Sequence, residues 1–109
     1  MNVYQIALPD TMNGSPVNYD AQRNQWMMAV LDHAGGLTVL GPRMGVWRDD
    51  ADGTVYRELM HWYEIACDKG TMDLIVWNAM QMFPDQKALY VSKLGTAEII
   101  SRPPVSGGE

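Results

Sequence analysis

The most constraining feature of the sequence is the turn signal at residues 50–53 (DADG), which separates two long segments rich in strand-forming residues. Asp-Gly favours a hairpin because both residue types tolerate the positive φ angles of a tight turn. Residues 37–49 and 54–67 are therefore expected to form two antiparallel strands. Gly41-Pro42 and Gly45 interrupt the first of them, which predicts a bent or bulged strand.

A strand and a helix are expected on each side of this hairpin. The first helix has a candidate cap at Asp20 and a stop at Gly35-Gly36, and the second has a cap at Asp68 or Thr71 and ends before Pro84. The second helix is apolar nearly all round, so we expect it to be buried on more than one side. The expected elements outside the hairpin are a strand at 2–8, a loop at 10–18, a helix at 20–33, a turn at 68–70, a helix at 71–83, a strand at 88–93, a turn at 94–96 and a short strand at 97–101.

This order is the β-α-β-β-α-β pattern of a ferredoxin-like α+β sandwich. It predicts an antiparallel sheet with two helices on one face, in a single domain over residues 1–101 followed by a flexible tail at 102–109. The opposite face of such a sheet is open, and apolar residues there would need a partner subunit.

Composition narrows the class of protein further. The chain of 109 residues is 47% hydrophobic, yet no apolar run approaches the ~20 residues that span a membrane. Pro9 and Asp10 interrupt the apolar start, so no secretory signal is expected, and the single cysteine, Cys67, fits a reducing cytoplasm. The net charge of -5 disfavours a nucleic-acid-binding surface and would attract a cationic small ligand.

Nine Met and four Trp residues admit two interpretations. They could fill and anchor the core, or they could build an apolar interface or a pocket for a flat ligand. Both interpretations can hold in an oligomer.

The candidate site lies on the second hairpin strand. Because side chains alternate along a strand, Tyr56, Glu58, Met60, Trp62 and Glu64 share one face. A carboxylate among aromatic rings could hold a cation, so Glu58 is the main candidate. The alternative is an ordinary surface Glu58 paired with Arg48 across the hairpin.

Other residues give weaker signals. Glu98, just after Thr96, could be a second acidic anchor near Glu58 or a plain surface residue. His61 and Glu64 point to opposite faces of a strand, so no metal site is expected. Cys67 has no catalytic companion in the sequence and is expected to be a buried thiol.

Several segments resemble the small phage-encoded S-adenosylmethionine lyases, formerly called SAM hydrolases. The likeness is collinear over residues 2–100 and is carried by Asn2-Val3-Tyr4, by Gly36-Leu37, by the run at 45–49 (GVWRD), and by the late strand with its Gly95-Thr96 turn. Trp47 stands where the family has a functional Tyr, and Glu58 keeps the family's interval of eleven positions from it. Residues 37–58 also resemble uncharacterised small ferredoxin-like domains.

The lyase resemblance implies a trimer like the PII proteins, with sites between subunits and no cofactor. The implied reaction closes S-adenosylmethionine to homoserine lactone with release of methylthioadenosine, and its implied use is phage counter-defence against restriction–modification in the host cytoplasm. Glu58 would be the catalytic anchor of the substrate's cation. The implied substrate-binding residues are Trp47, Tyr56, Trp62, Thr96 and Glu98.

The alternative is a non-catalytic oligomeric ferredoxin-like module that binds a nucleotide-like ligand or a protein partner through the same aromatic and acidic face. A purely structural assembly protein is a third interpretation, in which the Met-rich surfaces are only interfaces.

Overall fold

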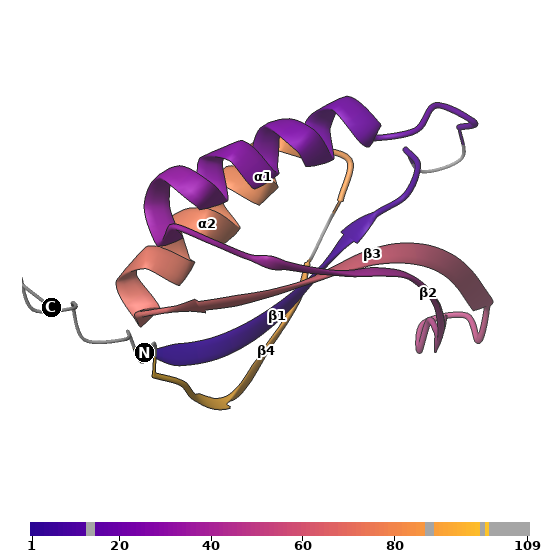
Figure 1. Ribbon diagram of the computed structural model, residues 1–109. Helices are drawn as coiled ribbons and strands as arrows, with labels where there is room; N and C mark the ends of the chain where they lie inside the picture. The colour runs from indigo at the N-terminus through magenta and orange to yellow at the C-terminus, as the bar shows by residue number, and fades with distance from the viewer. Residues whose placement is uncertain (13–14, 87–88, 99, 101–109) are drawn as a thin grey trace, which may run out of the picture.

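The computed structural model describes residues 1–12, 15–86, 89–98 and 100. Two helices cover one face of a four-stranded sheet, as Figure 1 shows. The elements in chain order are β1 (Asn2–Pro9), α1 (Asp20–Ala34), β2 (Thr38–Arg48), β3 (Val55–Cys67), α2 (Lys69–Met82) and β4 (Tyr90–Thr96). The strands are arranged β2-β3-β1-β4, with antiparallel neighbours throughout. The predicted ferredoxin-like α+β sandwich is confirmed.

The core lies between the sheet and the two helices. Side chains alternate between the two faces along each strand, and directly opposed residues of antiparallel strands project to the same side. Every second residue of β1 and of β3 therefore faces the helices. Ile6 and Ile65 of the sheet and Trp26 of α1 are fully buried there, and the Trp26 Nε1 donates to the Ile75 carbonyl oxygen of α2 at 3.2 Å. The other buried residues of this core cluster are Tyr4, Leu8, Tyr19, Val30, Tyr63, Cys67, Met72, Ile75, Ala79 and Phe83.

The hairpin and the end of the first helix follow the sequence signals. Asp49 N donates to Thr54 O at 2.8 Å around the turn, and Gly53 adopts a φ of 75°. Gly35 closes α1 in the left-handed conformation, and its N–H donates to Leu31 O. The pairing of β2 with β3 shifts between Val39 and Gly41, so the bulged strand is confirmed.

Capping differs from the expectation in one helix. In α2, the Asp68 side chain accepts from Thr71 N at 2.8 Å, which makes Asp68 the cap and places residues 69 and 70 in the first helical turn. In α1 the cap position is Tyr19, so the prediction of an Asp20 cap is wrong. Asp20 instead forms an ion pair with Arg23, one turn further along, whose guanidinium also donates to the carbonyl oxygens of Pro9 and Asp10.

Three other predictions are wrong. Residues 94–96 continue β4 instead of forming a turn, and among residues 97, 98 and 100 there is no strand; residues 88, 99 and 101–109 lie outside the described part of the chain. The second helix is buried along one side only, because Leu74 and Trp77 are 52% and 61% exposed. Its apolar outer side is therefore uncovered in a single chain.

Candidate functional site

The candidate site is the part of the β2–β3 hairpin that extends beyond the helices (Figure 1). Trp47 and Tyr56 are cross-strand partners, and their rings stack with centroids 4.5 Å apart and 18° between planes. Glu58 lies two positions along from Tyr56, so it projects to the same, open face of the sheet. The structure thus brings together three of the predicted site residues.

The surroundings of Glu58 leave room for a ligand. Its cross-strand partner is Gly45, which has no side chain to cover it. Glu58 is partly buried, and it forms no ion pair with any other described residue. Arg48 is paired with Val55 and projects to the opposite face, so the alternative of an Arg48–Glu58 salt bridge is wrong.

Trp62 belongs to a second aromatic contact on the same face. It pairs with Ala7 of β1, and its ring meets that of Tyr90 edge-on at 5.2 Å. Four residues of strand separate it from Glu58, or about 13 Å. Tyr90 was missed in the sequence, because its contact with Trp62 depends on the order β3-β1-β4 and not on spacing within one strand.

Thr96 and Glu98 lie at the other end of the sheet. Thr96 pairs with Asn2, which in turn pairs with Cys67 at the end of β3. Cys67 is nine residues from Glu58, or about 30 Å along the strand. Within one chain, Glu98 and Thr96 therefore do not share a site with Glu58.

His61 and Glu64 of β3 each lie near a polar side chain, and burial affects the pKa values of Tyr63 and Cys67. His61 Nε2 lies 2.6 Å from Asp10 Oδ1 on the helix-facing side, whereas Glu64 is on the open face with the Gln5 amide 3.4 Å away. Burial raises the pKa of the Tyr63 phenol. The buried Cys67 thiol also has a raised pKa, because of burial and the neighbouring Asp68 carboxylate.

The described residues contain neither a metal-binding cluster nor a membrane-spanning helix. Over 1–12, 15–86, 89–98 and 100, no three His, Cys, Asp or Glu side chains are grouped so that they could hold a metal ion. In the same part of the chain, neither helix has the length and apolar character needed to cross a membrane.

The sheet order, the helices on one face and the hairpin are those of the ferredoxin-like fold in its PII-like form. No family model and no curated protein sequence matches the chain. Solved structures do match it, among them a divalent cation tolerance protein, CutA1. The protein from Thermus thermophilus has a TM-score of 0.68 at 12% identity, over 91% of this chain and 86% of its own.

Two further matching structures have related names. CutA1 from Oryza sativa has a TM-score of 0.67 at 10% identity, covering 91% of this chain and 82% of its own. CutA from Synechococcus elongatus has a TM-score of 0.58 at 11% identity, over 86% and 76%. At these identities the likeness establishes the fold.

These matches overturn the resemblance to S-adenosylmethionine lyases. The structural neighbours are CutA1 proteins, so the lyase activity, the S-adenosylmethionine substrate, the phage origin and the anti-restriction role are all wrong as interpretations. The physical reason lies in the hairpin register. Trp47 pairs with Tyr56, and Glu58 follows two residues later. Any hairpin with a loop of this length has the same interval of eleven positions, so the interval does not indicate the lyase family.

Proposed function

We propose that this protein is a non-catalytic module that assembles with copies of itself through the β2–β3 hairpin and binds a nucleotide-like ligand on its aromatic and acidic face. A single domain over residues 1–101, a homotrimer and a cytoplasmic location are part of the proposal. The observation that carries it is the apolar surface of the hairpin. Seven large apolar side chains of this hairpin are exposed in the isolated chain: Val39, Met44, Val46, Trp47, Val55, Tyr56 and Leu59.

These side chains lie on both faces of the hairpin. Trp47 and Tyr56 project to the open face, whereas Val46 and Leu59 project to the helix-facing side, where both remain exposed. A two-stranded hairpin is only marginally stable alone, and soluble monomers seldom expose contiguous apolar patches of more than a few hundred Å². Copies of the chain that pack on the hairpin would remove this surface from water.

The ligand-binding part of the proposal depends on Trp47, Tyr56 and Glu58. Stacked rings leave their outer faces available to a planar group such as a nucleobase. The Glu58 carboxylate, uncovered by Gly45, would attract a cationic part of the same ligand. Among these structural neighbours, divalent cation tolerance appears in the name of the Thermus thermophilus protein alone, and the proposal does not depend on it.

Sedimentation equilibrium or light scattering tests the assembly. We expect the wild-type mass to be a multiple of the 12.2 kDa chain, with three as the proposed number. Val46→Glu, which places a charge on the hairpin surface, should yield monomers. Met28→Glu is the matched control, because Met28 is exposed to a similar extent (62% against 60%) but lies on α1. A monomeric wild type, or equal dissociation by both variants, contradicts the proposal.

Calorimetry with adenosine compounds, with and without a positive charge, tests the ligand. Trp47→Leu and Glu58→Gln should both weaken binding, and Glu58→Gln should do so only for the charged compounds. Glu98→Gln should weaken it as well only if the Glu98 of a neighbouring copy completes the site. Conversion of a bound compound to product would overturn the non-catalytic part.

A further inference from the structure

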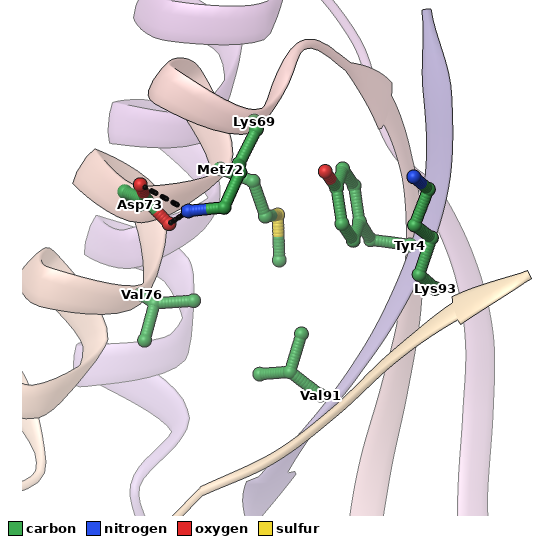
Figure 2. Close-up of a pocket in the computed structure, with 7 residues that line it drawn as sticks. All are labelled: Tyr4, Lys69, Met72, Asp73, Val76, Val91 and Lys93. Carbon is green, nitrogen blue, oxygen red and sulfur yellow. Dashed lines mark hydrogen bonds and ion pairs between the residues drawn. The ribbon is translucent and has the colours of Figure 1, made fainter.

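A separate groove lies between α2 and β4 (Figure 2). Its strand residues project to the helix-facing side of the sheet, opposite the face that carries Trp47 and Tyr56. Its volume is about 420 Å³, within the usual range of small-molecule sites. Its walls are the start of α2 and two strands of the sheet. The lining residues are Tyr4, Lys69, Met72, Asp73, Val76, Val91 and Lys93.

The polar groups of the groove gather at one end. Lys93 pairs with Tyr4 across the two strands, so both side chains project to the helix-facing side of the sheet. Lys69 and Asp73 occupy the first turns of α2, which starts two residues after the end of β3 and therefore near Tyr4. Figure 2 shows these four side chains toward the same end.

The other end of the groove is apolar. Val91 lies two residues before Lys93 on β4, opposite the buried Ile6, and Val76 lies nearly two helical turns beyond Lys69. Met72 lies between the two ends, and its flexible thioether can adapt to the shape of a ligand. The groove is thus amphipathic, with a polar end and a short apolar end.

The charge at the polar end suits one negative group. Two lysines and one aspartate leave one net positive charge, in a chain whose overall charge is -5. Lys69 Nζ lies 3.0 Å from Asp73 Oδ2, but both side chains are largely exposed, so their pair is weak and exchangeable. Lys93 has no ion pair among the described residues.

Tyr4 adds a hydrogen-bond donor beside Lys93. Its hydroxyl oxygen accepts from Asn2 Nδ2 at 3.1 Å, which leaves the hydroxyl proton for another acceptor. A carboxylate could then accept from the phenol and from the Lys93 ammonium together, while its hydrocarbon tail covers Val76 and Val91. We propose that this groove binds a monocarboxylate with a short apolar tail, independently of the hairpin and its ligand.

Octanoate is the probe, titrated by calorimetry and by methyl NMR, which reports on Met72, Val76 and Val91. Octanol and octylamine share its tail, and acetate shares its carboxylate. We expect octanoate to bind at least about tenfold more tightly than any of the three, because a charge-assisted hydrogen bond and the buried tail both contribute. The methyl signals of the groove should shift, and those of the hairpin should not.

Three variants separate carboxylate recognition from general adsorption. Lys93→Gln should weaken octanoate binding about tenfold, since it removes the unpaired cation. Asp73→Asn should strengthen binding, because it removes the competing acid and releases Lys69. Arg57→Gln, the control, removes an exposed cation from the hairpin and should change nothing. No binding, equal binding of octanol or octylamine, or equal effects of Lys93→Gln and Arg57→Gln would overturn the proposal.

Discussion

The Trp47 indole lies nearly parallel to the Tyr56 phenol, with 4.5 Å between ring centroids. The two residues are directly opposed on β2 and β3, so the register of the hairpin produces the contact. Both rings remain substantially exposed, at 48% and 38%. The pair therefore stiffens a hairpin that extends beyond the helices while it keeps outer ring faces available for a ligand or a neighbouring copy.

A double-mutant cycle measures this stacking. Trp47→Leu, Tyr56→Leu and the double variant should show a coupling free energy of about 0.5 kcal/mol in urea unfolding, since exposed cross-strand aromatic pairs contribute in that range. All four proteins must be compared at one concentration, because assembly shifts apparent stability. Strict additivity of the two single changes would mean that the rings do not interact in solution.

The end of α1 depends on one backbone conformation. Gly35 has a φ of 79°, and a Cβ at this position would meet no atom within 4 Å. Gly35→Ala should therefore reduce the free energy of unfolding by about 1 kcal/mol through the left-handed backbone alone, without a steric clash. Gly36→Ala is the matched control, because its φ is outside the left-handed region and its surroundings are equally open. Thermal unfolding of both variants checks the difference.

The fold could be predicted because its signals are local. Gly35 marks the end of α1, Gly53 closes the hairpin, and alternation along β3 assigns Glu58 and Trp62 to the open face. The predicted strand at 97–101 is absent at the described residues 97, 98 and 100. Gly95, with a φ of 152°, continues β4 with a register shift near Val3 instead of turning the chain.

The candidate site was only partly predictable, because it depends on distances along and across the sheet. The prediction that Glu98 lies near Glu58 is wrong within one chain, because the length of β3 separates the two residues. Tyr90 could not be matched with Trp62 without the strand order. The exposed hairpin surface could not be foreseen either, since the sequence gives apolar residues but not how far the helices extend over them.

Trp26 and Trp77 provide a matched test of packing in the two helices. Trp26 is fully buried and its Nε1 donates to Ile75 O, whereas Trp77 is 61% exposed. Trp26→Phe should reduce the free energy of unfolding by about 2 kcal/mol, because it leaves a void and removes the hydrogen bond from Nε1 to Ile75 O. Trp77→Phe should leave the chemical unfolding midpoint nearly unchanged. A large effect at Trp77 would instead indicate that α2 is covered in the assembly.

The phenol of Tyr19 donates a hydrogen bond to the Asp85 carboxylate. Burial, followed by that carboxylate, raises the pKa of Tyr19 from 10.0 to about 12. A raised pKa means that the protonated phenol favours the folded state. This contribution is complete below pH 10 and is lost as the pH rises through about 12. Tyrosinate absorbance should therefore show a phenol that ionises near pH 12 in the wild type and is missing in Tyr19→Phe. Asp85→Asn should lower that pKa but leave it above the usual value, because burial remains. An unchanged titration in Asp85→Asn would show that burial alone holds the proton on Tyr19.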